Sequence, residues 1–192
     1  MSRLLENPRV PEVEVDAMFV DRWSPRSFDP APLGEDQIAA LFEAARWAPS
    51  CFNEQPWLFC YATGENERQR YLGALVEKNR AWAQHAPLLV FVVARSQFRS
   101  NGKPNRHAAF DAGAAWMSLA IQARRLGLYA HAMAGFSVEK AHEILALDDE
   151  NYQVMAAVAV GRRSDPAALP EDLEKVEHPN ERKPLDEVMR KG

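Results

Sequence analysis

Residues 87–94 read Pro-Leu-Leu-Val-Phe-Val-Val-Ala, a run that contains no polar side chain. A strand with one face in water alternates apolar and polar residues, whereas a run that is apolar throughout predicts a strand covered on both faces. Residues 153–160, Gln-Val-Met-Ala-Ala-Val-Ala-Val, have a similar composition and end at Gly161. Two buried strands of this kind require packed layers of other elements on both faces of the sheet.

Other segments predict the rest of the sheet and its covering layers. Residues 57–63 form an apolar, aromatic-rich strand, and residues 128–132 form a short fourth strand. Helices are predicted where apolar residues recur at the spacing of one helical face. These helices lie just before Arg22, with Val13, Val15, Met18 and Phe19 on the apolar face, and over about residues 35–45, 67–83, 107–126 and 138–147.

The order of these elements predicts an α+β fold in which a small central β-sheet is flanked by helices. Residues 1–192 contain no internal repeat and no domain boundary, so a single domain is expected. The helix over residues 107–126 is rich in small residues and includes Gly113. A glycine inside a helix costs about 1 kcal/mol relative to alanine and is tolerated where another backbone comes close. This helix is therefore either the central helix of a monomer or the core of a homodimer.

The last segment, residues 162–192, differs in composition from the rest of the chain. It holds fifteen charged residues and four prolines, and its few apolar residues cannot form a core of their own. Such a tail is either free and disordered or wrapped over its own body or a partner subunit.

Composition excludes several classes of function. The chain has 192 residues, 47% hydrophobic and 26% charged, which is typical of a globular protein. Its net charge of −4 gives no general basic surface for a nucleic acid. The longest nearly uncharged run, residues 108–122, is broken by Asp111 and is shorter than the roughly 20 residues of a membrane span. We therefore expect no nucleic-acid partner and no membrane insertion.

Cysteine and histidine usage points to a reducing compartment and to the absence of a metal site. The two cysteines, Cys51 and Cys60, cannot form a disulfide framework, and the first twenty residues do not resemble a signal peptide. A cytoplasmic location is expected. The five histidines show no metal-ligand spacing, so no metal ion is expected.

The first candidate binding segment is Asp21-Arg-Trp-Ser-Pro-Arg-Ser-Phe-Asp29. In an extended chain, Arg22, Ser24 and Arg26 project from one face. Two guanidinium groups and a hydroxyl suit a phosphate monoester, and the chain has no glycine-rich phosphate loop that could replace them. The alternative is a solvated basic loop.

Three other segments carry weaker signals. Residues 48–57, with Cys51 at their centre, form a rigid polar loop between a helix and a strand, although no histidine motif accompanies the thiol as a base. Residues 131–136 include Ala134 and Gly135, which leave the backbone open to a planar ligand. Asn79 could hydrogen-bond a ligand. Taken alone, each segment is better explained as an ordinary turn or connection.

Taken in order along the chain, these segments resemble the nitroreductase family of FMN-dependent oxidoreductases. No single segment is diagnostic, and the resemblance rests on their number and order from about Val13 to Val188. The matching segments are Arg22-x-Ser24-x-Arg26-x-Phe28, Glu43-Ala-Ala-Arg-Trp-Ala-Pro-Ser50, Asn53-x-Gln55-Pro-Trp57, Asn79-x-x-Trp82-x-x-x-Ala86-Pro87, Asp111-x-Gly113, Leu126-Gly-Leu128, Gly135-Phe136 and Arg182-Lys-Pro-Leu185.

The resemblance implies an intertwined homodimer with two FMN molecules bound at the subunit interface. Arg22, Ser24 and Arg26 would hold the FMN phosphate and ribityl chain, with the backbone of Trp23 beside them. Arg182 would close the phosphate site from the tail.

The resemblance also assigns residues to the flavin ring. Asn79 would meet the pyrimidine edge, and the backbone of Met133, Ala134 and Gly135 would lie over the ring near N5. The other subunit would complete the pocket with Pro49, Ser50, Cys51 and Asn53. Trp82 stands where some larger members have a lysine, and Ala134 places no hydroxyl or carboxylate near N5, which favours two-electron transfer.

The implied reaction is ping-pong transfer of a hydride from NAD(P)H through N5 of FMN to an electron-poor acceptor such as a nitroaromatic, a quinone or an enone. The chemistry belongs to the flavin, so no catalytic acid or base is expected. Alternatives are a dedicated reductase or dehalogenase of one metabolite in the same family, a flavin-binding storage or sensor protein, and a dimeric scaffold without a cofactor.

Overall fold

The computed structural model describes residues 7–192 and places a five-stranded antiparallel sheet at the centre of the molecule. The long strand β5 (Tyr152–Arg163) pairs with β3 (Leu88–Arg95), which in turn pairs with β2 (Trp57–Ala62). Along the other side of β5 lie β4 (Tyr129–Met133) and the two-residue strand β1 (Phe28–Asp29). All four expected strands are present, whereas β1 has too little sequence pattern to be predicted.

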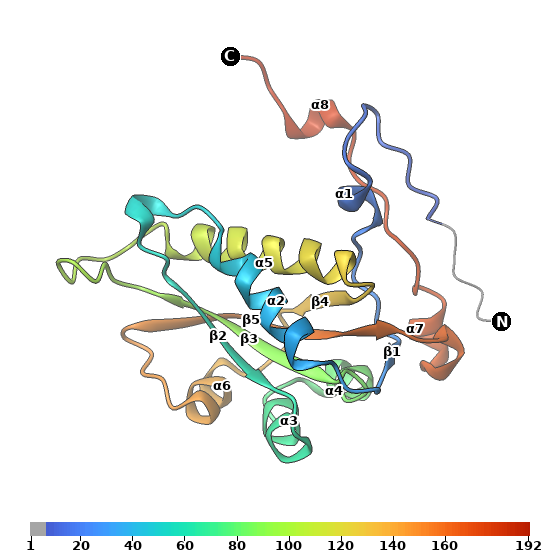
Figure 1. Ribbon diagram of the computed structural model, residues 1–192, viewed down its shortest axis with the longest axis horizontal. Helices are drawn as coiled ribbons and strands as arrows, with labels where there is room; N and C mark the ends of the chain where they lie inside the picture. The colour runs from blue at the N-terminus through green and yellow to red at the C-terminus, as the bar shows by residue number, and fades with distance from the viewer. Residues whose placement is uncertain (1–6) are drawn as a thin grey trace.

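Helices cover both faces of the sheet, as Figure 1 shows. One layer consists of α2 (Glu35–Arg46) and α5 (Ala108–Arg125). The opposite layer consists of α3 (Glu65–Leu72), α4 (Glu77–Ala83) and α6 (Val138–Leu145). The predicted α+β architecture, a small sheet flanked by helices, is therefore confirmed.

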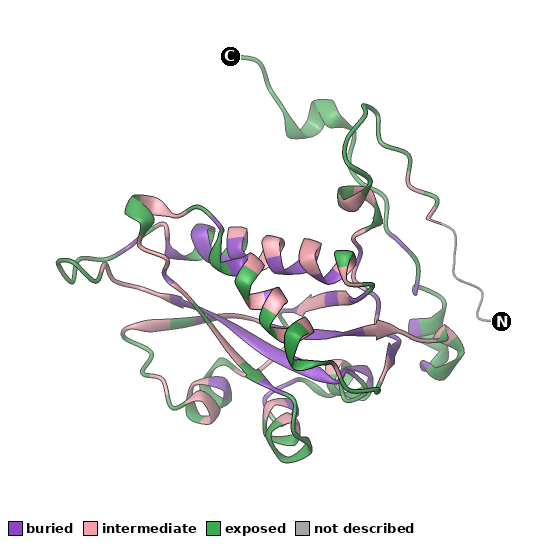
Figure 2. Ribbon diagram, in the orientation of Figure 1, coloured by how far each residue is buried: buried purple, intermediate pink, exposed green. Residues whose placement is uncertain are grey.

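The central strand β3 is buried on both faces, which explains its apolar sequence. Val90 and Val92 belong to the core cluster beneath α2 and α5. Phe91 and Val93 belong to the second cluster, on the side of α3, α4 and α6. Figure 2 shows the buried residues gathered along this strand and on the inner faces of the helices.

The expected helix over residues 67–83 is wrong, because the chain forms two helices, α3 and α4, with a break between them. Leu75 leaves the helix to form an antiparallel bridge with Phe136. The N–H of Val76 donates to the carbonyl of Gly135 at 3.1 Å, and the N–H of Ser137 donates to the carbonyl of Ala74 at 2.8 Å. Tertiary pairing therefore overrides the helical pattern, and it brings the start of α4 next to residues 135–137.

The first helix is also shorter than expected. Asp16 caps α1 (Ala17–Asp21) by accepting from the N–H of Met18 at 2.8 Å, so the helix begins after Val13 and Val15. Both valines lie outside the helix and are exposed. The predicted apolar face that included them does not form.

The segment after β5 passes along the body and then away from it. It contains a short 3-10 turn (Pro166–Ala168), α7 (Glu171–Glu174) and α8 (Leu185–Val188). In Figure 1 the α8 end extends beside α1, away from the sheet. The N–H of Leu185 donates to Oε1 of Glu12 at 2.9 Å, so the start of α8 lies beside the segment that precedes α1.

Candidate functional site

Residues 22–27 form an extended segment, called the arginine segment below, whose side chains alternate between solvent and core. Arg22, Ser24 and Arg26 are half-buried, whereas the residues between them are buried. Nη1 of Arg22 lies 3.4 Å from Oγ of Ser24. The segment therefore presents two guanidinium groups and a hydroxyl on one face, in the arrangement that the spacing predicted.

The buried side of this segment is fixed by aromatic packing and by hydrogen bonds to distant parts of the chain. The ring of Trp23 makes an edge-on contact with Tyr129, with 6.0 Å between centroids. The guanidinium of Arg163 lies over the Trp23 ring. Oγ of Ser27 donates to the carbonyl of Asp165 at 2.7 Å. The exposed face is thus presented from a rigid support.

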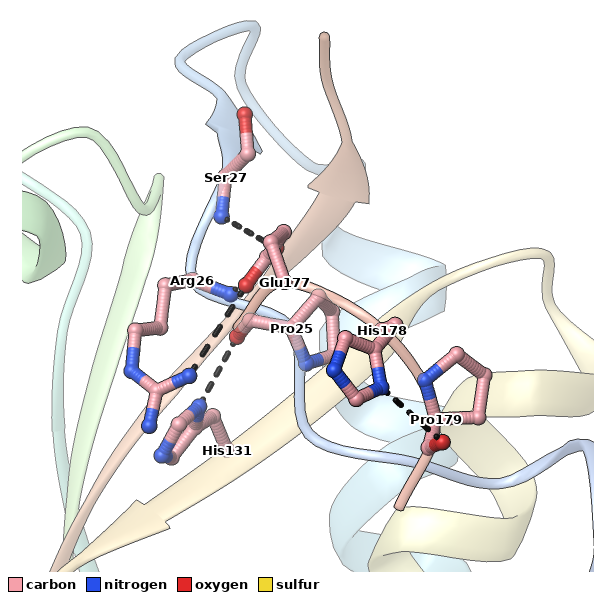
Figure 3. Close-up of polar contacts among 7 residues, drawn as sticks. All are labelled: Pro25, Arg26, Ser27, His131, Glu177, His178 and Pro179. Carbon is pink, nitrogen blue, oxygen red and sulfur yellow. Dashed lines mark hydrogen bonds and ion pairs between the residues drawn. The ribbon is translucent and has the colours of Figure 1, made fainter. Parts of the chain in front are cut away.

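His131 of β4 links this segment to the sheet. Its Nδ1 lies 2.8 Å from the carbonyl oxygen of Pro25 and must carry the proton, because a carbonyl can only accept (Figure 3). Burial, assisted by the positive charges of Arg26 and Arg22, lowers the pKa of His131 from 6.5 to about 4. His131 is therefore a neutral support rather than an additional cation.

Arg9, Arg22 and Arg182 form a cationic cluster that joins the N-terminal segment, residue 22 and the tail. Nε of Arg9 donates to the carbonyl of Asn180 at 2.6 Å, and its Nη1 donates to the carbonyl of Arg22 at 2.9 Å. Burial, and then the charge of Arg182, lowers the pKa of Arg22. None of the ion pairs formed by residues 7–192 involves these three arginines. The cluster is suited to an anion that would compensate its charge.

Asn79 and residues 133–135 meet at a second position. Nδ2 of Asn79 donates to the carbonyl of Gly135 at 3.1 Å. A Cβ atom on Gly135 would lie 2.6 Å from the same nitrogen, so the close approach requires glycine. Met133 is buried, whereas Ala134 is exposed. The structure thus brings together the residues that were expected at the flavin ring.

Trp82 packs in the core next to the arginine segment and on the same helix as Asn79. It is 1% exposed, stacks on Phe28 with 6.2 Å between centroids, and lies 4.6 Å from the ring of His131. Because α4 also carries Asn79, this packing fixes the Asn79 position relative to the arginine segment. Trp82 itself belongs to the core.

The loop of residues 49–55 is strained and is held at the start of α5. The N–H of Cys51 donates to Oδ2 of Asp111 at 3.0 Å, and Oγ of Ser50 accepts from the N–H of Gln55 at 2.9 Å. Phe52, Asn53 and Gln55 have φ values of 53°, 56° and 50°. This left-handed conformation costs roughly 1–2 kcal/mol for each residue other than glycine. Pro49 and Asn53 are exposed at the surface of the loop.

This loop does not meet the arginine segment within one chain. Asp111, which holds the loop, is in the first turn of α5, whereas Arg124, stacked on the Tyr129 ring beside Trp23, is in the last. At about 1.5 Å per residue, these two ends of the helix are roughly 20 Å apart. In Figure 1 the loop and the N-terminal segment lie at opposite ends of α5.

Two residues that complete this region, Glu177 and Arg9, could not be recognised from the sequence. Glu177 is one of many acidic residues in the tail, yet its side chain is fully buried against residues 26 and 27. Arg9 precedes the first recognisable motif. Only the folded chain brings them to the arginine segment.

Comparison with known proteins gives a consistent result. The nitroreductase family matches residues 20–81 and 74–162. A solved structure described as an oxidoreductase containing FMN is 41% identical, has a TM-score of 0.92, and aligns over 97% of this chain and 96% of its own. A Streptomyces coelicolor protein provisionally named NADH dehydrogenase/NAD(P)H nitroreductase is 26% identical, over 84% of this chain and 89% of its own. A CLA biosynthesis enone reductase of Lactiplantibacillus plantarum is 25% identical, over 77% of this chain and 84% of its own.

The matched segments contain both the arginine segment and the Asn79–Gly135 contact. They extend over well more than half of the chain, and the similarity to the solved FMN-containing structure extends over nearly all of it. The resemblance that the ordered motifs indicated is therefore confirmed. The chain belongs to the nitroreductase family.

Proposed function

We propose that this protein is an FMN-dependent oxidoreductase that passes electrons from NAD(P)H to an electron-poor acceptor such as a nitroaromatic, a quinone or an enone. Family membership supports this function, as does the FMN of the solved relative with 41% identity. The observation that carries the proposal is the cluster of Arg9, Arg22 and Arg182, because none of the ion pairs among the described residues involves it.

The arginine segment would hold the phosphate end of FMN. Arg22, Ser24 and Arg26 present donors on one face, and Arg182 approaches from the tail. Bonds from guanidinium groups to phosphate are charge-assisted and stronger than neutral hydrogen bonds. Burial is the chief cause that lowers the pKa of Arg9 and Arg22, and the charges of neighbouring arginines lower it further. A bound phosphate would relieve this repulsion.

Asn79 and the backbone of residues 133–135 would hold the flavin ring. Gly135 has no side chain that would separate this backbone from Asn79, so an amide edge stays open beside a planar group. When bound, FMN supplies the hydride and electron chemistry, and the protein orients the ring and excludes water. Ala134 offers no proton donor, so no catalytic acid or base is assigned.

A second copy of the chain would complete the pocket. Within one chain, the loop that carries Pro49, Ser50, Cys51 and Asn53 lies at the far end of α5 from Trp23. An antiparallel pairing of two α5 helices would bring the loop of one subunit to the arginine segment of the other. Gly113 is exposed, and no atom of the described residues outside its own stretch of helix lies within 4 Å of where a Cβ would stand, which leaves room for a partner helix.

The segments 8–20 and 181–188 offer another surface for such a dimer. Between them lies a groove of about 720 Å³, lined mostly by apolar residues such as Val13, Phe19 and Val188, together with charged residues that include Arg9 and Arg182. Phe19 is 58% exposed and Val188 is 65% exposed. Burial of such residues against a second subunit would stabilise an intertwined dimer.

Spectroscopy of the purified protein tests this function. We expect the absorption band of oxidised flavin, its loss on anaerobic addition of NADPH or NADH, and its return on addition of a nitroaromatic. A flavin band that resists both nucleotides would instead indicate a storage protein. Colourless protein that does not bind added FMN would contradict the proposal.

Gly113→Leu tests whether the subunit interface builds the site. We expect the apparent mass in solution and the FMN content to fall together, because the leucine occupies the space of the partner helix. Glu143→Leu, at an exposed position in α6 on the opposite face of the sheet, is the control. A monomer that retained tight FMN would contradict the shared pocket.

A further inference from the structure

We propose that Glu177 is the positioning residue of the arginine segment, through which docking of the tail sets the geometry of the phosphate site. This inference rests on the proposed function. Glu177 follows α7 and is 2% exposed. Its Oε1 accepts from the N–H of Arg26 at 2.8 Å and from the N–H of Ser27 at 2.9 Å, as Figure 3 shows.

The burial of Glu177 is specific to this position. The neighbouring acids Glu174 and Glu181 are exposed. A carboxylate is strongly hydrated, so its removal from water is unfavourable unless protein donors replace the lost water. Two consecutive backbone amides supply that replacement, which explains why this acid of the tail is buried and the others are not.

The second carboxylate oxygen faces the side chain of Arg26. Oε2 is buried without a hydrogen-bond partner among residues 7–192, and its ion-pair contact is with Nη1 of Arg26 at 3.9 Å. This contact is too long for a hydrogen bond, so Glu177 attracts the guanidinium without occupying its donors. Within the described part of the chain, the guanidinium donors of Arg26 remain free for a ligand on the exposed face.

The two amide bonds fix the backbone from which the binding side chains project. Because side chains alternate along an extended segment, the orientation of the peptide groups at residues 26 and 27 decides the face on which Arg26 and Ser24 emerge. His131 holds the preceding carbonyl, that of Pro25, from β4. Glu177 holds the opposite side from the tail, five residues before Arg182. The tail therefore contributes both a ligand-binding residue and the residue that orients the segment.

Glu177 does not itself bind the phosphate. Its carboxylate lies on the buried side of the segment and would repel an anion. Loss of Glu177 should therefore reduce the contribution of the phosphate to FMN affinity without affecting recognition of the flavin ring. Riboflavin, which has the ring and ribityl chain of FMN but no phosphate, distinguishes these two contributions.

The experiment compares Glu177→Ala, Glu177→Gln and the exposed control Glu174→Gln in the full chain. Dissociation constants for FMN and riboflavin are measured by fluorescence titration, and thermal unfolding is measured without flavin. We expect Glu177→Ala to weaken FMN binding about 10- to 100-fold and to leave riboflavin binding unchanged. Glu177→Gln retains an oxygen for both amides and should recover most of the FMN affinity.

Three results would overturn the inference: equal losses for FMN and riboflavin, no loss in Glu177→Ala, or a Glu177→Gln variant as weak as Glu177→Ala. If Glu177→Ala does not fold, Glu177→Gln alone still tests the inference. It should bind FMN more tightly than riboflavin, as the wild type does, and loss of this preference would contradict the inference. A wild-type chain that does not bind FMN more tightly than riboflavin would instead contradict the proposed phosphate site. Failure of the inference and failure of the proposed function are therefore distinguishable.

Discussion

The arginine segment, residues 22–27, and the strained loop, residues 49–55, are each held by a buried carboxylate, but they are built differently. Glu177 binds two amides of the arginine segment, and Asp111 binds one amide of the loop. The segment has no residue with positive φ, whereas the loop has three. One half of the proposed site is therefore held by distant contacts with an unstrained backbone, and the other combines such contacts with a strained backbone.

This difference shows how each half is stabilised. The contacts of the arginine segment come from β4 and from the tail, more than a hundred residues away in sequence. The loop is closed by its own Ser50–Gln55 bond and is tethered to α5 by Asp111. It also contacts residues 98 and 99 through the Phe52 ring and Oε1 of Glu54. Strained conformations persist at functional positions where the surroundings impose them. The loop is thus the half whose shape requires a functional explanation.

The largest expected effect tests whether the arginine segment binds the anion. Arg22→Ala/Arg26→Ala should weaken FMN binding by several kcal/mol, at about 1.5–3 kcal/mol for each charged hydrogen bond. Equilibrium dialysis against FMN measures the loss. Arg70→Ala/Lys140→Ala removes two exposed charges elsewhere and should have little effect. Full FMN occupancy in the first variant would show that the segment is not the anion site.

Acid should weaken the support of the arginine segment. The pKa of His131 is about 4 in the folded chain and 6.5 when exposed. Between these values the unfolded chain binds a proton that the folded chain does not. The free energy of unfolding should therefore have its full value above pH 6.5 and fall by up to about 3 kcal/mol as the pH decreases to about 4.

Urea unfolding of the wild type and His131→Gln at several pH values checks this dependence. The stability difference between them should narrow as the pH falls, because the variant has no proton to bind at this position. His85→Gln, at an exposed position, should follow the wild type. A constant difference between pH 7 and pH 4 would refute the assignment to His131.

A smaller effect is expected at the tether of the loop. Asp111→Ala leaves the N–H of Cys51 without its acceptor and should lower the free energy of unfolding by about 1–3 kcal/mol. Asp111→Asn retains an acceptor oxygen and should lose less. Denaturant unfolding and amide exchange at Cys51 measure both. An alanine variant as stable and as protected as the wild type would mean that the loop is self-supporting.

The smallest effect separates strain from contact. Ala146 ends α6 with a φ of 52° and is exposed, so Ala146→Gly should stabilise the protein by about 1 kcal/mol. Phe52→Gly relieves similar strain but loses the edge-on contact with Phe98, which is worth about 0.5–1.5 kcal/mol. The second variant should be nearly neutral in thermal unfolding. Equal gains in both would show that the aromatic contact contributes nothing.

The sequence predicted features that depend on local spacing. The alternation of Arg22, Ser24 and Arg26 follows from the geometry of an extended chain, and the apolar run at 87–94 follows from burial on both faces. The break after α3 could not be predicted, because it depends on pairing of Leu75 with Phe136, far along the chain. The left-handed conformation of Phe52 has no sequence signature, since aromatic residues do not favour it.

Strand β5 has a consequence for the stability of the proposed site. It pairs with β4 through residues 157–161 and with β1 through Arg162 and Arg163, while its other edge carries β3. The arginine segment leads into β1, and the Met133–Gly135 backbone continues from β4. Local unfolding that released either one would have to separate hydrogen bonds along the same strand. Both ends of the proposed pocket therefore belong to one cooperative unit, so partial melting of the sheet would not open one end alone.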